Sequence, residues 1–253
     1  MRLLTQARDL RRRRAREERG AFVAEGVRAV EELLRSSLAV HGVLVAPQLA
    51  GAQRGAALRE QLASGAVEVL EVSEREFSSA ADTESPQGVL AIAEIPARTF
   101  PVLAPGQSAR IVVLDAVQDP GNVGTIVRTA SALGADATVA LPGTVDLWNA
   151  KVIRGAMGAH FHHPAFAATL EQLLCWAVEV ELTIWGADGA GEPFSRETHP
   201  PARLALCVGN EGAGLTAPVR EACGRLVAIP LADAVESLNV AVATGILLNA
   251  VRP

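Results

Sequence analysis

Cysteine is scarce in this sequence. The 253 residues include three cysteines, Cys175, Cys207 and Cys223, and none of them has the C-x-x-C spacing of zinc ribbons or redox pairs. Three unpatterned cysteines fit a reducing compartment and exclude a disulfide framework. We therefore expect a cytoplasmic protein.

Long apolar runs are missing as well. No stretch reaches the roughly 18 consecutive apolar residues that a membrane-spanning helix needs. The charged start of the chain is not followed by the apolar core of a signal peptide, so we expect neither a secreted nor a membrane protein. No internal repeat or low-complexity tract is present beyond one run of arginines.

Positive charge is concentrated at one end of an otherwise acidic chain. The formal net charge is -5, yet residues 1–19 hold eight arginines against three acidic residues. Clustered cations of this kind are typical of phosphate contact, and they are equally typical of a solvated helix face. We predict that residues 1–19 form a basic helical arm and that Arg11, Arg12, Arg13 and Arg14 contact nucleic acid.

The next part of the chain has the pattern of a small α/β domain, residues 20–96. Strands are expected at 22–23, 40–46, 67–72 and 88–94, and helices at 27–34, at 56–63 and from Ser73 through Phe77. This alternation indicates an α/β sandwich. Residues 97–109 are rich in proline and polar side chains and are the expected linker.

Residues 110–253 have the pattern of a second, parallel α/β domain. Strands are expected at 111–114, 137–141, 181–187, 204–208 and 226–231, with an extended stretch at 161–166. Helices are expected at 125–133, 149–157 and 170–178, after the glycine loop that follows residue 208, and from Leu238, which Ser237 would cap. Such alternation predicts a parallel sheet with crossover helices, and ligands of such sheets bind at the carboxyl ends of the strands.

Three stretches of this second domain carry a specific signal. The first runs from Asn122 to Arg128 (NVGTIVR) and the second from Val208 to Leu215 (VGNEGAGL). The third begins at Ile229-Pro230 and continues as ESLNVAVA over residues 236–243. In this order they resemble the motifs of the SpoU family, the TrmH-like RNA methyltransferases of the SPOUT superfamily. A weaker resemblance upstream, in FVAEGVRAVEELL and SPQGVLAIAE, is to the ribosomal-protein-like substrate-binding domain of family members.

The resemblance implies a fold and an activity. Family members transfer a methyl group from S-adenosylmethionine to a ribose 2'-hydroxyl of ribosomal or transfer RNA, and we expect ribosomal RNA here. Their catalytic domain is a trefoil-knotted α/β domain at the carboxyl terminus. They are homodimers through this domain, with the active site near the interface, and they use no metal.

The resemblance also assigns residues. It implies catalytic roles for Asn122, Arg128, Glu211, Ser237 and Asn239. It implies cofactor contacts from Val208, Gly209, Asn210, Gly212, Ile229, Leu231, Leu238 and Asn239. We add Lys151 and Arg154, one helical turn apart, to the candidate RNA-binding arginines. Without the resemblance the same side chains would be assigned as turn residues, helix caps and exposed cations.

Two other functions stay open at this point. One is an RNA-binding relative that has lost catalysis. The other is a nicotinamide-dependent oxidoreductase, since residues 212–217 fit the G-x-G-x-x-A fingerprint with Asp233 in the place of the ribose-binding acid, although little chain follows it. His160, His162 and His163 would alternate between the faces of an extended stretch, and no nearby cysteine or carboxylate completes a metal site.

Overall fold

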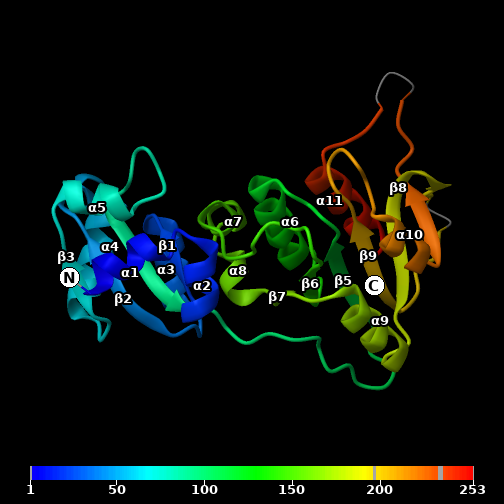
Figure 1. Cartoon of the computed structure of the whole chain (residues 1–253), viewed down its shortest axis with the longest axis horizontal. Coiled ribbons are helices and arrows are strands. Elements are labelled where there is room, and N and C mark those ends of the chain that lie inside the picture. Colours follow the sequence, from blue (N-terminus) through cyan, green and yellow to red (C-terminus); the bar gives the residue numbers. More distant parts are fainter. Residues whose placement is uncertain (1, 196–197, 233–235, 253) are drawn as a thin grey trace. The chain divides into compact units, whose positions relative to one another are not determined.

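The computed structural model describes residues 2–195, 198–232 and 236–252 (Figure 1). The chain divides into two compact units, and each is built from two separate segments. Unit 1 comprises residues up to Ala97 together with Trp148–His162, and unit 2 comprises Arg98–Leu147 and His163–Pro253. Among the described residues no helix is long and apolar enough to cross a membrane.

Unit 1 is a mixed four-stranded sheet covered by helices. The strand order is β1-β4-β2-β3, with β4 antiparallel to β1 and β2, and β2 parallel to β3. Its elements are α1 Arg2–Asp9, α2 Arg13–Arg19, β1 Ala21–Glu25, α3 Val27–Arg35, β2 Val40–Val45, a 3-10 helix Pro47–Gly51, α4 Gln53–Ser64, β3 Val69–Glu71, α5 Glu74–Ala80, β4 Val89–Glu94, α7 Ala150–Ala156 and α8 Ala159–His162.

The α/β pattern predicted for residues 20–96 is confirmed element by element, with shifts of a few residues at the ends. Ser73 caps α5 as expected. Its hydroxyl accepts from the backbone N–H of Glu76, and the Glu76 carboxylate accepts from the backbone N–H of Ser73, which makes a complete capping box.

The basic N-terminal segment is part of the folded unit and not a separate arm. It forms two helices, and Leu3, Leu4, Ala7 and Leu10 are buried in the core against strands and α5. Arg16 is buried too, and its guanidinium donates to the backbone oxygens of Leu10 and Arg11 where the chain passes from α1 to α2. The prediction of a basic helical arm over residues 1–19 is therefore wrong, because the segment forms two helices packed in the unit.

The segment Trp148–His162 comes from the middle of the second predicted domain but packs in unit 1. Phe22 of β1 lies against Trp148, with ring centroids 4.5 Å apart, and against Phe161 at 5.8 Å. Trp148 also meets His160 edge-on at 4.4 Å. Sequence periodicity cannot find such a contact, because it joins residues more than a hundred positions apart.

Unit 2 is a wholly parallel six-stranded sheet of order β10-β8-β9-β5-β6-β7, as the alternating pattern predicted. Its elements are β5 Ala109–Leu114, α6 Pro120–Ala132, β6 Ala137–Ala140, β7 Ala165–Ala167, α9 Leu170–Glu179, β8 Thr183–Pro193, β9 Arg203–Val208, α10 Ala217–Ala222, β10 Arg225–Ala228 and α11 Val240–Ala250.

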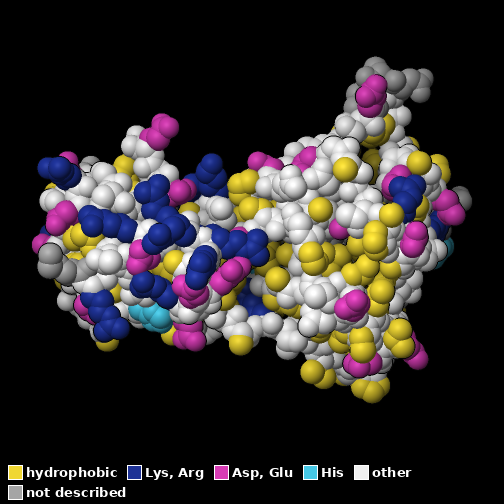
Figure 2. All heavy atoms as spheres, in the orientation of Figure 1, with side chains coloured by type: hydrophobic (Ala, Val, Ile, Leu, Met, Phe, Trp, Pro, Cys, Tyr) yellow, Lys and Arg dark blue, Asp and Glu magenta, His cyan; other side chains and the backbone are white. Residues whose placement is uncertain are grey.

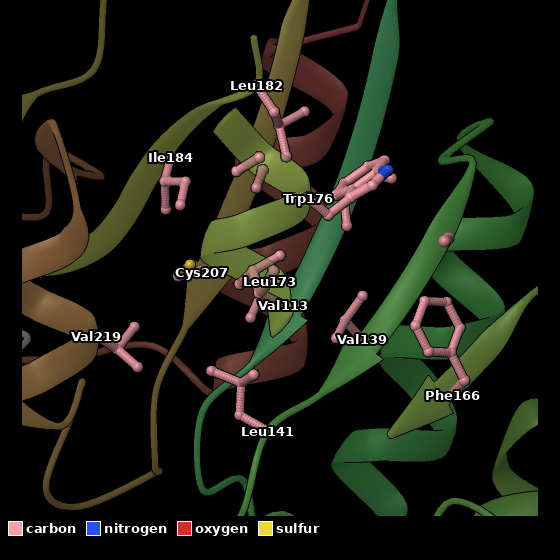
Figure 3. Close-up of a cluster of buried hydrophobic side chains, with 14 of the residues drawn as sticks. Val113, Val139, Leu141, Phe166, Leu173, Trp176, Leu182, Ile184, Cys207 and Val219 are labelled. Carbon is pink, nitrogen blue, oxygen red and sulfur yellow. The ribbon is translucent and has the colours of Figure 1, made fainter. Parts of the chain in front are cut away.

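Helices cover both faces of this sheet. On one face, Leu173 and Trp176 of α9 and Val219 of α10 pack on Val113 and Cys207 of the strands (Figure 3). The opposite face is covered by α6 and α11, which lie side by side (Figure 1). The expected linker is ordered where it meets this unit, because Phe100 stacks on Trp176 at 4.8 Å.

Strand β8 leaves the sheet for part of its length. Its register with β10 pairs Gly186 with Leu226 and then jumps to Glu192 opposite Val227. Residues 187–191 therefore form an excursion beside the carboxyl end of β10. Gly191 is required where the strand returns, since a Cβ there would lie 2.6 Å from the Leu226 carbonyl carbon.

Three local predictions in the second half of the chain are wrong. Helix α6 begins at Pro120, capped by the Asp119 carboxylate, so Asn122 lies in its first turn and not in a loop. Residues 159–162 are helical, which removes the alternating-strand argument for the three histidines. Helix α11 begins at Val240 with Asn239 as its cap, in place of Ser237.

Candidate active site

The three motifs meet at the carboxyl edge of the sheet in unit 2. Strands β5 and β9 are neighbours, and the chain runs to β6 after β5 but to the other side of the sheet after β9. This is a switch point in strand order, where ligands of open α/β sheets bind. The loop after β5 leads into α6, and the loop after β9 carries the glycine motif.

Glu211 is the centre of the contacts between these loops. Its Oε1 accepts from the Asn122 side-chain amide at 2.9 Å and from the backbone N–H of Asp119 at 3.2 Å. Its Oε2 accepts from the backbone N–H of Gln118 at 3.3 Å. One carboxylate thus joins the second motif to the start of the first.

Asn122 extends this network to the third motif. Its Oδ1 accepts from the Asn239 side-chain amide at 2.9 Å. The Asn239 Oδ1 in turn accepts from the backbone N–H groups of Ala241 and Val242 and so caps α11. Glu211, Asn122 and Asn239, which the resemblance implicated as catalytic residues, therefore form one continuous hydrogen-bonded chain.

Asn210 has its whole side chain engaged by the protein. Its Nδ2 donates to the backbone oxygen of Ala116 at 2.9 Å, and its Oδ1 accepts from the N–H groups of Gly212 and Ala213 at 3.0 Å. Since both ends of the amide are used, the side chain positions the loop, and its backbone is what a ligand in the adjacent pocket would meet.

A buried carboxylate, that of Asp115, holds the C-terminal end of the glycine loop that follows β9. Asp115 is 2% exposed and follows β5 directly. It accepts from the backbone N–H of Thr216 at 2.6 Å and from the Thr216 hydroxyl at 3.2 Å. The next residue, Ala116, has a left-handed backbone with φ 55°, a costly conformation for alanine that the surrounding bonds hold in place.

Gly209 is required by the protein itself. A Cβ at this position would lie 2.2 Å from the carbonyl carbon of Gly214 and 2.4 Å from the nitrogen of Leu215. We expected the close approach at Gly209 to be to a cofactor, whereas the close neighbour in the structure is the returning backbone of the loop. A Cβ on Gly212 would have only one neighbour within 4 Å, the Asn210 side-chain oxygen at 3.8 Å.

The environment of Glu211 keeps it ionised. Burial raises the pKa of Glu211, but hydrogen bonds from the Asn122 amide and from the backbone N–H groups of Glu211, Asp119 and Gln118 outweigh that effect. The pKa of this carboxyl therefore lies below its ordinary value. A permanent carboxylate here acts as a fixed acceptor that orients Asn122.

This lowered pKa predicts a pH signature. Because the folded-state pKa lies below the unfolded value of about 4.5, the stabilisation from Glu211 is complete above that pH and is lost as pH falls through the folded value. The variant Glu211→Gln should melt below the wild type at neutral pH, and the gap should close below about pH 4.5. A gap in melting temperature that widens in acid would contradict the assignment.

A pocket opens beside this network. It is lined by the β8 excursion, the ends of β9 and β10, the segment before α11 and the first turns of α11: Ala187, Asp188, Gly189, Val208, Gly209, Asn210, Glu211, Gly214, Val227, Ala228, Ile229, Leu231, Glu236, Ser237, Leu238, Val240, Ala243 and Leu247. Of the predicted cofactor residues, Val208, Gly209, Asn210, Ile229, Leu231 and Leu238 line it, while Gly212 and Asn239 do not.

Arg128 stands apart from this network. It is exposed on α6, six residues beyond Asn122, and within residues 2–195, 198–232 and 236–252 it has no hydrogen-bond or ion-pair partner. Its helical neighbours Thr125 and Thr129 line a shallow groove between α6 and α11. Ser237 lines the pocket instead of capping a helix.

The predicted RNA-binding cations all lie in unit 1, but most are paired. Arg12 binds Asp9, Arg13 binds Glu17 and Arg14 binds Glu18, each at 2.7 Å. Arg154 binds Asp82 at 2.9 Å. Arg11 and Lys151 are exposed and make no side-chain hydrogen bond or ion pair to any other described residue. Figure 2 shows how densely arginine and lysine gather over this unit.

His160 and His163 are buried, whereas His162 is exposed. His160 is fully buried against Trp148, and His163 contacts the Thr138 hydroxyl at 2.9 Å. Burial and the nearby charge of Arg98 lower the pKa of His163 to about 4, so this ring is neutral at physiological pH. In the described parts of the chain no three histidine, cysteine or acidic side chains are grouped so that they could hold a metal ion.

Sequence reasoning missed several residues of the site. Asp115, Asp119 and Thr216 hold the loops, and Asp188 lines the pocket. Two of these residues, Asp119 and Asp188, could have been found from the sequence. Asp119-Pro120 is the signature of a helix start, and Asp188 directly follows the expected strand 181–187, at the edge where ligands bind. The partner of Asp115 lies a hundred residues away and left no local signal.

Solved structures with the same architecture are RNA methyltransferases. The chain is similar to the SpoU methyltransferase AviRb from Streptomyces viridochromogenes in complex with AdoMet, with a TM-score of 0.87, 26% identity and coverage of 98% of this chain and 96% of that one. It is also similar to an AdoMet-bound rRNA methyltransferase from Sinorhizobium meliloti, with a TM-score of 0.80, 31% identity and coverage of 98% and 93%.

Residues 109–249 match the model of the SpoU rRNA Methylase family, and residues 3–91 match the MRM3-like substrate binding domain. The first match spans more than half of the chain, which belongs to the SpoU rRNA methylase family. A relative in Bacillus subtilis strain 168, 23S rRNA (guanosine(2553)-2'-O)-methyltransferase RlmP, is 35% identical over 244 residues, or 96% of this chain and 93% of the relative.

Proposed function

We propose that this protein transfers a methyl group from S-adenosylmethionine to a ribose 2'-hydroxyl of ribosomal RNA. The observation that carries the proposal is the hydrogen-bonded chain Glu211–Asn122–Asn239, which unites all three motifs beside one pocket. Relatives named for this reaction on 23S rRNA, one of them 35% identical over 96% of this chain, support the substrate class.

The pocket fits the cofactor chemically. Its lining is mostly backbone and apolar side chains, suited to a flat base, and every charged residue among its described members is acidic: Asp188, Glu211 and Glu236. S-adenosylmethionine supplies a methyl group on a positively charged sulfonium. We assign Val208, Gly209, Asn210, Ile229, Leu231 and Leu238 to its binding, with Gly212 and Asn239 acting through loop and helix geometry.

The remaining side chains position the ribose and handle its proton. A bond forms between the 2'-oxygen and the methyl carbon as the carbon–sulfur bond breaks, and the hydroxyl proton must leave. A guanidinium is a hydrogen-bond donor with no acceptor site, so we assign Arg128 to clamping a substrate phosphate and steering the proton toward that phosphate. Asn122, Asn239 and Ser237 orient the ribose, and positioning of this kind supplies on the order of 7–11 kcal/mol.

The proposed reaction is tested by identifying the methylated nucleoside that it forms. Purified protein, labelled S-adenosylmethionine and ribosomal RNA should yield label in a 2'-O-methylnucleoside after nuclease digestion. Label only in a base, or none, would refute the reaction. The oxidoreductase alternative is not favoured, since residues 109–249 match the SpoU rRNA Methylase family. Asp233, the acid proposed for that alternative, lies outside the described residues.

We propose that unit 1 supplies RNA affinity, mainly through Arg11 and Lys151. Deleting residues 1–19 would remove the core residues Leu3, Leu4, Ala7 and Leu10, so point changes are the better test. Arg11→Gln with Lys151→Gln should weaken RNA binding and lower the salt slope of log K by roughly 0.7 for each phosphate that the protein no longer neutralises. Arg59→Gln, at an exposed arginine paired with Glu71 in the same unit, is the control. An unchanged salt slope would show that Arg11 and Lys151 do not contact RNA phosphates.

We propose that a second copy of the chain covers the α6–α11 face. Val242 and Ile246 of α11 are 51% and 44% exposed, and they line the groove between α6 and α11 together with Thr125 and Thr129 of α6. A two-fold contact at this face would place Arg128 at the interface. The trefoil knot and a cytoplasmic location, both typical of the family, remain predictions.

This interface has a direct test. Ile246→Asp should turn a dimer into a monomer by light scattering, because a charge would be buried against its symmetry mate. Val178→Asp is the matched control, since Val178 is 81% exposed on α9 in the same unit. If both variants dissociate the dimer, or if neither does, the α6–α11 face is not the dimer interface.

A further inference from the structure

The β8 excursion brings one acidic residue, Asp188, to the wall of the proposed cofactor pocket. Residues 187–191 leave the ladder with β10, and Ala187, Asp188 and Gly189 line the pocket. A strand that continued in register would keep this position in the sheet. The detour, closed at Gly191 where no Cβ fits, brings Asp188 to the pocket wall.

The Asp188 carboxylate is held from two sides. Its Oδ1 accepts from the backbone N–H of Ala190 at 2.8 Å, which closes the turn of the excursion. Its Oδ2 binds the guanidinium of Arg220 on α10. The Asp188 side chain is 13% exposed whereas that of Arg220 is 44% exposed. Asp188 is among the residues that line the pocket, whereas Arg220 is not.

The negative charge of the pocket lining matters because the cofactor and the product of the reaction differ in charge. S-adenosylmethionine carries one positive charge more than S-adenosylhomocysteine, and the two are otherwise nearly the same in shape. Apolar contacts respond little to this difference in charge. A partly buried carboxylate does respond to it, since screening by water is weaker there than at the surface.

We infer that Asp188 is a specificity-determining residue that makes the pocket prefer the cationic methyl donor to its neutral product. The inference rests on the proposed placement of the cofactor in this pocket. Arg220 tunes the preference as the counter-ion of Asp188.

Calorimetry with the two ligands tests this inference without any catalysis. The quantity of interest is the ratio of the dissociation constant for S-adenosylhomocysteine to that for S-adenosylmethionine. Asp188→Asn should lower this ratio roughly three- to tenfold, and Arg220→Gln, which leaves the acid without its counter-ion, should raise it. A general loosening of the pocket would weaken both ligands together and leave the ratio unchanged.

A control variant and a pocket-filling variant distinguish a wrong role for Asp188 from a wrong assignment of the pocket. Glu192→Gln removes an acid of the same strand that pairs with Arg225 outside the pocket lining, and it should leave the ratio unchanged. Ala243→Phe fills the pocket and should abolish binding of both ligands. If Ala243→Phe blocks binding but Asp188→Asn leaves the ratio unchanged, the role of Asp188 is refuted and the pocket stands. If folded Ala243→Phe protein binds both ligands normally, the pocket assignment itself falls.

Discussion

The variant Arg128→Ala is expected to lose methyl transfer by roughly a hundred- to ten-thousandfold while binding S-adenosylmethionine normally. Arg128 is exposed on α6 and has no partner among the described residues, so its removal exposes no buried charge and breaks no internal bond. An arginine whose side chain has no partner among the described residues is available to a substrate phosphate. The measurement is single-turnover transfer to ribosomal RNA, with cofactor affinity from calorimetry.

Two further variants sharpen this result. Arg128→Lys keeps the charge but not the two-pronged donor, so it should recover only part of the activity. Arg252→Ala, at an exposed arginine near the end of the chain, should behave as the wild type. Normal transfer by folded Arg128→Ala protein would remove Arg128 from the mechanism. A parallel loss of cofactor binding would make its role structural.

The second large effect is expected at Gly209. In Gly209→Ala the new Cβ would sit 2.2 Å from the Gly214 carbonyl carbon, a distance that no real Cβ tolerates, so the backbone must move. Overpacking of this kind costs about 1–3 kcal/mol in the free energy of unfolding. Because the same loop carries Asn210 and Glu211, cofactor binding should fall by at least about tenfold, a loss of roughly 1.4 kcal/mol. Denaturation and calorimetry measure the two effects separately.

Gly212→Ala is the matched control in the same loop. Its Cβ would have only the Asn210 side-chain oxygen within 4 Å, at an ordinary contact distance of 3.8 Å, and its backbone is not in the left-handed region. Its stability should stay within about 0.5 kcal/mol of the wild type. Equal losses at both glycines would show that the loop demands flexibility in general, and would contradict the steric account of Gly209.

Much of this architecture was predictable because its signals are local. The parallel sheet followed from short apolar runs separated by helices, and the Ser73 cap followed from the spacing of Ser73 and Glu76. The motif resemblance selected Glu211, Asn122 and Asn239, which the structure joins by hydrogen bonds, and their catalytic roles stay a proposal. The start of α6 was also locally encoded, since an aspartate before a proline marks a helix N-terminus, although we placed it five residues too late.

Apart from the local errors at α6, α8 and α11, the features that were not predicted are contacts between distant segments. The docking of Trp148–His162 on β1 depends on Phe22, and the burial of α1 depends on strands that follow it in the chain. The pairing of Asp115 with Thr216 spans 101 positions. Such contacts are selected by packing and hydrogen bonding in the finished fold, and a pattern read over ten or fifteen residues does not contain them.

A crystal structure of the protein soaked with S-adenosylmethionine tests the central claim most directly. The account predicts the cofactor in the pocket formed by the β8 excursion, Val208, Ile229 and Leu238, with its methyl group directed toward the Glu211–Asn122–Asn239 chain. Cofactor bound elsewhere on the molecule, or bound in this pocket with its methyl group turned away from Asn122 and Asn239, would contradict it.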